Sequence, residues 1–190
     1  MLKNIPADCV RADVASPVGT LTLLASKEGL HAVLWEHERA RPECTRALAA
    51  VPESPRHPVL ARAKAQLGEY FAGRRRRFDL PLVFEGTPFQ IRAWQQLARI
   101  PYGTTLSYAE QAARLGDAKK ARAVGTANAK NPLSIIVPCH RVIAKSGALA
   151  GFGGGLENKE LLLDLEARTA SLRGRARRRR PARRSSPSRS

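Results

Sequence analysis

Residues 135–143 read IIVPCHRVI, an apolar run that ends at a cysteine followed directly by histidine and arginine. With Leu133 and Ser134 in front of it, the run is rich in β-branched residues and predicts a strand over 133–137. The thiolate is the reactive form of cysteine, and neighbouring cationic or proton-accepting groups raise its population. On these residues alone, Cys139 fits an activated nucleophile and a buried, inert cysteine equally well.

The segment before this run predicts a helix-turn-helix. Residues 87–90 read TPFQ, which offers an N-cap threonine, a proline at the first helical position and a glutamine at the third, so a helix should extend to 97–99. Residues 107–110 read SYAE, a second capping box that opens a short helix ending at Gly116. A third helix over about 119–129 mixes basic and small residues, as a DNA-facing helix would. A tightly packed interior helix is an equally weighted alternative.

The N-terminal part predicts a small α/β unit. Two β-rich runs, 18–25 and 30–35, are separated by a glycine-containing turn and should form a hairpin. Apolar residues at spacings of three and four then predict a helix over 60–71. The arginine run 74–77 fits a solvated loop better than a phosphate contact, and 78–84 predicts one more strand before a domain boundary near residue 85.

The C-terminal end predicts a closing helix followed by a tail. Residues 157–167 contain four leucines in a helical pattern, and the chain from Arg173 onward is rich in arginine, serine and proline. Such a composition is typical of disorder. We therefore expect an N-terminal domain at 1–85, a C-terminal domain at 86–170 and a disordered arginine-rich tail at 171–190.

The charge of the chain indicates an anionic partner. Its 33 Lys and Arg face 16 Asp and Glu, which gives a net charge of +17 and a pI of 11.1. Nine arginines in the last twenty residues supply about half of this charge. Nucleic acid is favoured over a membrane, because no apolar run reaches the roughly 18 to 20 residues of a spanning helix. The N-terminus lacks the pattern of a secretory signal, so a cytoplasmic protein is expected.

The three cysteines do not form a recognisable framework. Cys9, Cys44 and Cys139 contain no CxxC pair, which argues against disulfides and fits a reducing compartment. Cys9 and Cys44 with His31 and His37 match no compact zinc-ligand spacing. We expect no metal site.

Several further motifs accompany the run at 135–143. They are Asn131-Pro132, Gly151-Phe152-Gly153-Gly154-Gly155-Leu156 and Leu162-Leu163-Asp164-Leu165-Glu166. Together they resemble the O6-alkylguanine-DNA alkyltransferases, or methylated-DNA–protein-cysteine methyltransferases, and most closely their bacterial members. The resemblance is specific over residues 87–166 and loose before them. It implies a mixed α/β (α+β) fold with an N-terminal ribonuclease-H-like domain that lacks catalytic residues and a C-terminal winged helix-turn-helix domain.

The resemblance also implies a chemistry. Cys139 would accept the alkyl group of O6-alkylguanine in duplex DNA, and His140 would remove its proton through a water molecule. Glu166 would orient His140, and Asn131 would brace the turn beside the cysteine. The thioether product is a poor leaving group, so each molecule should react once, without a cofactor. Whether O4-alkylthymine is also a substrate stays open.

DNA contacts follow from the same resemblance. Arg122 would enter the duplex in place of an extruded base, and Tyr108 would crowd the 3′ phosphate and help to turn the nucleotide out. The small residues Ala121, Ala123 and Ala127 would let the helix approach the minor groove. We expect a monomer and leave cooperative binding to DNA open. The tail at 171–190 should add salt-dependent affinity for any DNA, because it neutralises phosphates.

The guanine pocket is implied to include Pro138, Val142, Phe152 and Gly153. Some family members carry a tyrosine followed by a serine where this chain has Phe152 and Gly153. A hydroxyl contact is then missing, and we expect an emptier pocket that admits alkyl groups larger than methyl.

Three other functions remain to be weighed against this one. A recognition-only protein of the alkyltransferase-like class would have another residue in place of Cys139. A winged-helix transcription factor would account for the helix-turn-helix but leave Cys139, His140 and Glu166 without a purpose. A cysteine hydrolase would regenerate its thiol and turn over.

Overall fold

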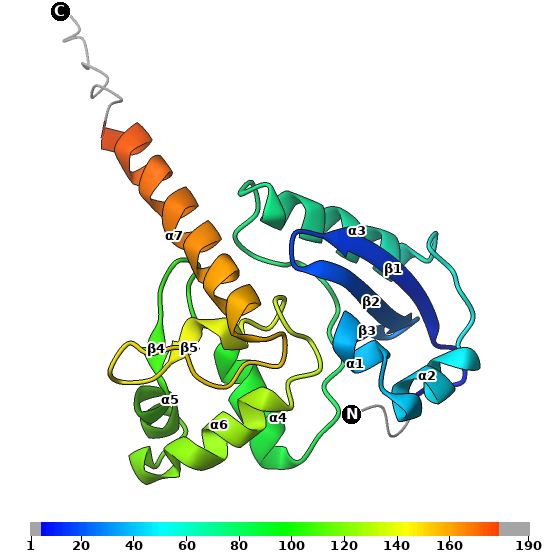
Figure 1. Cartoon of the computed structure of the whole chain (residues 1–190), viewed down its shortest axis with the longest axis horizontal. Coiled ribbons are helices and arrows are strands. Elements are labelled where there is room, and N and C mark those ends of the chain that lie inside the picture. The colour runs from blue at the N-terminus through cyan, green and yellow to red at the C-terminus, as the bar shows by residue number, and fades with distance from the viewer. Residues whose placement is uncertain (1–4, 179–190) are drawn as a thin grey trace, which may run out of the picture.

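The computed structural model describes residues 5–178, with side chains through residue 171, as an N-terminal sheet unit joined to a C-terminal helical unit (Figure 1). The sheet contains β1 (Val10–Ser16), β2 (Gly19–Ser26) and β3 (Gly29–Trp35) in the order β1-β2-β3, with antiparallel neighbours. The predicted hairpin is confirmed as β2 and β3. β1, which sequence reasoning missed, pairs with β2 along its whole length.

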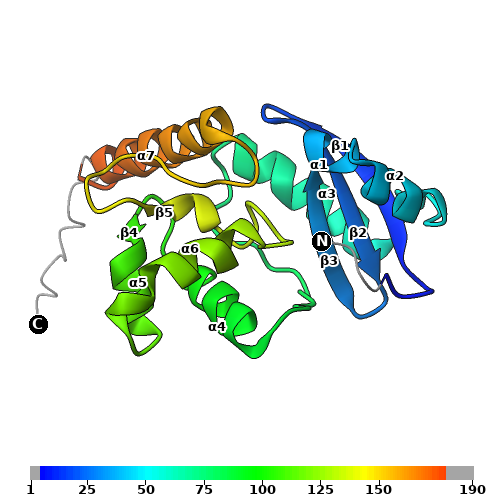
Figure 2. The same cartoon turned by 60° about the horizontal axis from the view of Figure 1, so that its bottom comes forward.

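Helices cover the sheet unit. The short α1 (Glu36–Arg39) and α2 (Pro42–Ala49) follow β3, and α3 (Pro58–Phe71) lies along one face of the sheet (Figures 1 and 2). α3 turns a buried stripe with helical spacing toward the sheet, as the sequence pattern predicted: Leu60, Ala63, Leu67 and Tyr70. Gly73, at a φ of 68°, ends the helix in a conformation that favours glycine.

The strand predicted over 78–84 is wrong. This segment makes only an isolated bridge between Leu30 and Leu82, in which the N–H of Leu30 donates to the carbonyl of Pro81 at 2.8 Å. Proline has no N–H with which to extend a ladder. In addition, the side chain of Gln66 accepts the N–H of Asp79 at 2.8 Å, so this donor is already used.

The C-terminal unit begins with the helices that the capping boxes predicted. α4 (Pro88–Leu97) and α5 (Tyr108–Arg114) both carry a reciprocal capping box, from Thr87 with Gln90 and from Ser107 with Glu110. A turn of 3₁₀ helix, η1 (Ala118–Lys120), leads into α6 (Ala121–Ala129), which confirms the third helix. The helix-turn-helix is therefore present as α5 and α6, and α4 packs against α6 (Figure 2).

The strand predicted over 133–137 is also wrong. The N–H of Val137 donates to the carbonyl of Leu133 at 2.8 Å, which closes a turn instead of extending a strand. Ile135 has a φ of 74°, a strained conformation for a β-branched residue. After the turn come the 3₁₀ helix η2 (Cys139–Arg141) and β5 (Val142–Ile143), which pairs in parallel with β4 (Leu106–Ser107).

The closing helix is longer than predicted. α7 runs from Leu156 to Arg178, so the expected start of the tail at residue 171 lies within the helix (Figure 1). Residues 179–190, the rest of the predicted tail, lie outside the described residues. The mixed α/β fold is confirmed.

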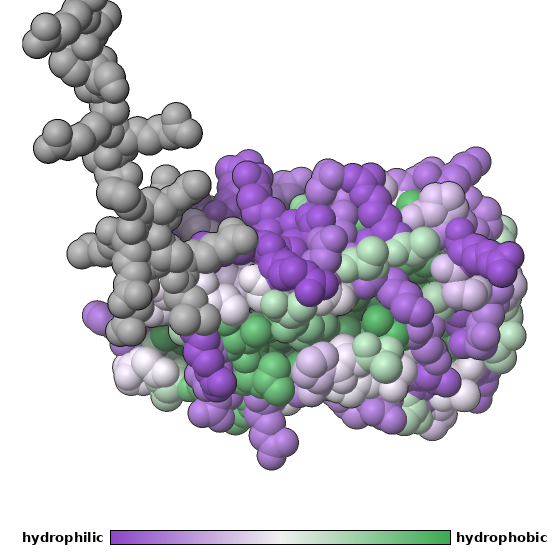
Figure 3. Space-filling view, turned by 90° about the horizontal axis from the view of Figure 1, so that it is seen from above, coloured by the Kyte–Doolittle hydropathy of each residue, from purple (hydrophilic) through white to green (hydrophobic). Residues whose placement is uncertain are grey.

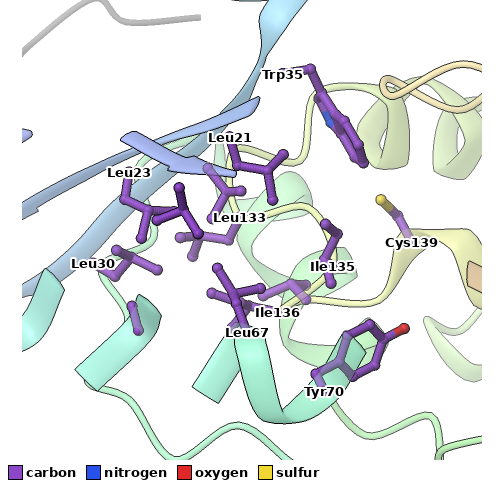
Figure 4. Packing of buried hydrophobic residues seen from close by; sticks show 14 of the residues in the cluster. Leu21, Leu23, Leu30, Trp35, Leu67, Tyr70, Leu133, Ile135, Ile136 and Cys139 are labelled. Carbon is purple, nitrogen blue, oxygen red and sulfur yellow. The ribbon is translucent and has the colours of Figure 1, made fainter. Parts of the chain in front are cut away.

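One hydrophobic core joins the two units. Its main cluster contains Leu21, Leu23 and Trp35 of the sheet together with Leu133 and Ile135 of the turn before the cysteine (Figure 4). The backbone also crosses the junction, because the N–H of Val33 donates to the carbonyl of Pro132 at 2.8 Å. On the surface seen in Figure 3, hydrophobic side chains form a band between hydrophilic ones. The position of the turn that bears the cysteine thus depends on the sheet.

Gly154 shows how closely the units pack. A Cβ at this position would lie 2.5 Å from the indole ring of Trp35. We expect Gly154→Ala to lower the free energy of unfolding by about 1 to 3 kcal/mol through overpacking. Urea denaturation measures the change.

The matched control is Gly68→Ala on α3, where no atom lies within 4 Å of the added Cβ. Alanine has the higher helix propensity, so this variant should be as stable as the parent or more stable by up to about 1 kcal/mol. Equal stability of Gly154→Ala and the parent would contradict the tight packing.

Candidate active site

Asn131 organises the turn that carries Cys139. Its side-chain carbonyl accepts the N–H of Leu133 at 3.0 Å, and its amide donates to the carbonyl of Val137 at 2.7 Å and to the sulfur of Cys139 at 3.2 Å. Asn131 is itself buried. Asn131 thus lies beside the cysteine, as the sequence analysis expected.

The sulfur of Cys139 is almost fully enclosed. The residue is 5% exposed, and the hydroxyl of Ser134 lies 3.9 Å from the sulfur. Burial raises the pKa of the thiol above its ordinary value of 9.0, although Asn131, Ser134 and the charge of Lys159 oppose the rise. The thiol is therefore protonated at neutral pH and needs a base in order to react.

His140 is placed to be that base. Its Nε2 lies 2.9 Å from the Oε1 of Glu166, and the ring is fully buried. Burial lowers the pKa of His140, so the ring is neutral at pH 7. Because an ionised carboxylate can only accept, Nε2 carries the hydrogen and the lone pair of Nδ1 is free. Nδ1 is buried and has no hydrogen-bond partner within the described part of the chain.

Glu166 of α7 is the centre of a buried network. Besides His140, its carboxylate accepts from Arg141 through Nη2 at 2.8 Å and Nε at 2.9 Å, from the hydroxyl of Tyr70 at 2.8 Å and from the N–H of Gly103 at 2.8 Å. Burial by itself would raise the pKa of Glu166, but the hydrogen bonds from His140 and Arg141 outweigh it and lower the pKa to about 2. Glu166 is thus an anion that fixes the imidazole.

Lys159, also on α7, binds two backbone carbonyls of the segment that follows the cysteine. Its buried ammonium donates to the carbonyl of Val142 at 2.7 Å and to that of Ala150 at 2.8 Å. The hydroxyl of Tyr108 donates to the same carbonyl of Ala150 at 2.8 Å, and its ring centroid lies 5.9 Å from the ammonium. Burial raises the pKa of Tyr108, and so does the nearby Cys139. Tyr108 therefore lies at the edge of the site as a neutral phenol.

The residues expected to line the pocket gather around the same point. Pro138 and Val142 flank the Cys139–Arg141 turn and are buried. The ring of Phe152 stands edge-on to His140, with centroids 6.3 Å apart. Gly153 follows Phe152 in the loop before α7, where an added Cβ would lie 3.9 Å from Glu38 of the sheet unit.

The DNA-facing residues proposed on α6 divide into two groups. Arg122 and Ala123 are exposed, and Ala121 is half-buried. Ala127 is only 2% exposed, and its carbonyl accepts the indole N–H of Trp94 at 2.9 Å. Ala127 faces α4 in the core and cannot approach a groove, so including it in the DNA-facing set was wrong.

Sequence reasoning missed several contributors to the site. Arg141 stands within the cysteine motif but was given no role, whereas Tyr70, Ser134 and Lys159 carried no signal that singled them out. Tyr70 lies in the sheet unit, 96 residues before Glu166 in the chain, and its hydroxyl donates a hydrogen bond to the Glu166 carboxylate. Only the folded chain brings these residues together.

Two negative observations concern the described part of the chain. Within it, no three side chains of the His, Cys, Asp or Glu type come together as a metal site. None of its helices combines the length and hydrophobicity needed to cross a lipid bilayer.

Comparison with known proteins covers both units. Residues 10–84 match the family model "6-O-methylguanine DNA methyltransferase, ribonuclease-like domain", and residues 88–168 match "6-O-methylguanine DNA methyltransferase, DNA binding domain". A methylated-DNA--protein-cysteine methyltransferase of Mycolicibacterium paratuberculosis is 46% identical over 155 residues, which is 82% of this chain and 90% of that protein. One of Methanosarcina acetivorans is 44% identical over 153 residues, 80% of this chain and 94% of that protein.

Solved structures agree with this likeness. The O6-methylguanine methyltransferase of Mycobacterium tuberculosis matches with a TM-score of 0.75 and 39% identity, over 92% of this chain and 96% of that one. A structure of Mycobacterium tuberculosis OGT in complex with DNA matches with a TM-score of 0.71 and 41% identity, over 85% of this chain and 93% of that one.

The Glu166 network predicts a sensitivity to acid. Folding lowers the pKa of Glu166 from 4.5 to about 2, so the unfolded chain binds the proton first as the pH falls. The stability that Glu166 contributes is complete above pH 4.5 and is lost as the pH falls toward 2. His140 adds a loss of the same sign below its ordinary pKa of 6.5, because its folded pKa is lowered.

Urea unfolding of three proteins across this pH interval tests the prediction. Glu166→Gln should be less stable than the parent at pH 7 by about 3 to 5 kcal/mol, because it leaves Arg141 buried without a counter-charge. Its stability should then change less with acidification. Glu160→Gln, an exposed position on the same helix, should behave like the parent. A decline equally steep in all three proteins would show that Glu166 is not responsible.

Proposed function

The chain belongs to the 6-O-methylguanine DNA methyltransferase family, and on this premise we propose that Cys139 is the residue that takes the alkyl group from DNA. The protein repairs DNA by direct reversal, transferring the alkyl group of O6-alkylguanine to a cysteine of its own. The observation that carries the assignment is the placement of the Cys139 sulfur beside Asn131, with the next residue, His140, fixed on Glu166.

The transfer begins with removal of the thiol proton. The free lone pair of His140 Nδ1 takes this proton through one water molecule, and Glu166 stabilises the imidazolium that forms. The amide of Asn131 donates to the sulfur and stabilises the developing thiolate, since its 3.2 Å contact already lowers the thiol pKa. The charge of Lys159 acts in the same direction.

The bond changes follow an in-line displacement. A lone pair of the sulfur forms the new bond to the alkyl carbon while the bond between that carbon and O6 breaks, and its electrons leave with the guanine. The guanine takes up a proton from water and becomes an undamaged base, and the imidazolium of His140 returns the thiol proton to water. The S–C bond of the thioether is not cleaved under these conditions, so each molecule acts once.

The lesion must leave the base stack to reach the sulfur of Cys139, a residue that is only 5% exposed. The exposure of Arg122 on α6 supports a role in filling the space of the flipped base, and Tyr108 on α5 would crowd the adjoining phosphate. Gly125 lies on the face of α6 against Tyr108, where an added Cβ would be 3.6 Å from the ring. Ala121 and Ala123 support a close approach to the groove.

The proposed function also includes a domain division, a compartment and an oligomeric state. The division at residues 85 and 86 separates a supporting sheet unit from the unit that binds DNA and carries Cys139. Three free cysteines support work in the reducing cytoplasm. One chain contains every residue assigned to the reaction, which supports a monomer as the active form.

Mass spectrometry tests the assignment of Cys139. After mixing with a duplex that carries one O6-methylguanine, the protein should gain the mass of one CH₂ group per molecule, located at Cys139 by peptide mapping. Cys139→Ala should gain nothing. Cys44→Ala removes another buried cysteine and should be methylated like the parent. Methylation of the Cys139→Ala protein would refute the assignment, and lesion-selective binding without any transfer would favour a recognition-only protein.

A second experiment tests the role of Arg122. We expect Arg122→Ala to slow transfer from a duplex by about tenfold or more, because the extruded base is no longer replaced in the stack. Single-turnover rates should fall much less with a single-stranded oligonucleotide, whose lesion is already accessible. Arg46→Ala, an exposed arginine on α2, is the matched control. An equal loss on both substrates would point to general charge attraction instead.

A further inference from the structure

Trp35 is a residue of the sheet unit that lies at the active site. It is the last residue of β3 and is 2% exposed. Its backbone N–H donates to the carboxylate of Glu38 at 3.1 Å, which fixes the end of the strand as α1 begins. The indole packs against Phe152 and Gly154 of the C-terminal unit.

The indole fills the space beside the glycine-rich loop. The ring of Phe152 stands edge-on to it, with centroids 5.5 Å apart at 74°. An added Cβ on Gly154 would lie 2.5 to 2.7 Å from three atoms of the indole. The lack of a side chain at Gly154 is thus what lets Trp35 reach this position. The loop and the indole form one packed wall.

The sulfur of Cys139 faces this wall. Figure 4 shows the indole of Trp35 and the sulfur of Cys139 directed toward one another from opposite units, and both belong to the same core cluster. Phe152 closes the adjoining side, because its ring also stands against His140. The indole and Phe152 thus form a boundary on the side to which the sulfur points in Figure 4.

The indole N–H gives a second, independent observation. Trp35 Nε1 is buried and has no acceptor within the described part of the chain, whereas the indole of Trp94 donates to the carbonyl of Ala127 at 2.9 Å. A buried donor without a partner destabilises the folded state. Among the described residues, the indole N–H of Trp35 is therefore a free donor beside the glycine-rich loop.

We infer that Trp35 is a specificity-determining residue that limits the size of the group transferred to Cys139. The inference rests on the proposed function and adds to it a contribution of the sheet unit to substrate choice. It also changes the expectation that Gly153 leaves an emptier pocket, since the glycine-rich segment at 153–154 lies against Glu38 and Trp35 of the sheet unit. In this chain, a smaller side chain at position 35 is what would admit larger alkyl groups.

The test compares two lesions in the same duplex, O6-methylguanine and O6-benzylguanine, with the parent, Trp35→Phe and Trp35→Leu. Single-turnover rates give the ratio of benzyl to methyl transfer for each protein. We expect the ratio to rise by about tenfold or more in Trp35→Leu, as for a pocket enlarged by several carbon atoms, and by less in Trp35→Phe. Trp94→Phe, which changes the other buried tryptophan, should leave the ratio unchanged.

Each outcome decides the inference. A ratio that stays the same or falls in both Trp35 variants, measured on protein that unfolds cooperatively, would overturn it, as would an equal rise in Trp94→Phe. Trp35→Phe keeps an aromatic ring and serves if Trp35→Leu does not fold. Failure of the proposed function would look different, because the parent would then transfer no methyl group to Cys139 at all.

Discussion

The buried carboxylate of Glu166 is the interaction on which the site depends. It ties together α7, the Cys139–Arg141 turn, the loop at Gly103 and, through Tyr70, the sheet unit. Replacing such a network by packed apolar residues is often neutral or stabilising, so stability does not explain its presence. What it provides is geometry: a neutral imidazole with a defined tautomer, held directly after the cysteine.

Burial creates the chemical problem that this network solves. Enclosing Cys139 raises the pKa of its thiol, and enclosing His140 lowers the pKa of the imidazole, so both groups are neutral in the resting protein. A neutral thiol is a weak nucleophile and is protected from unwanted reaction. In the proposed mechanism, proton transfer to His140 produces a charge pair whose positive member lies against Glu166 and whose negative member is stabilised by Asn131 and the charge of Lys159.

The sequence predicted the parts of the fold that rest on local signals. The capping boxes of α4 and α5 involve residues three positions apart, and the stripe of α3 repeats every three or four residues, so both are readable without the fold. The segments 78–84 and 133–137 were misread as strands, because side chains of Gln66 and Asn131 bind backbone groups there and override β propensity. In the site, the family motifs pointed to Cys139, His140 and Glu166. Tyr70 and Trp35 belong to the other unit, so no local sequence pattern connects them with the site.

The strained turn before the cysteine explains why the sheet unit is needed. Ile135 adopts a φ of 74° and is fully buried, a conformation that a β-branched residue keeps only when its surroundings enforce it. The enforcing contacts come from both sides: Asn131 within the turn, and Val33 of β3, whose N–H binds the carbonyl of Pro132. Without the sheet, the turn would lose this bond and the apolar surface that Ile135 packs into, and only the hydrogen bonds within the turn, those of Asn131 among them, would oppose its relaxation. Cys139 would then move away from Asn131. We therefore expect the N-terminal unit to act on the chemistry through the backbone of the turn, a role that needs no catalytic residue of its own.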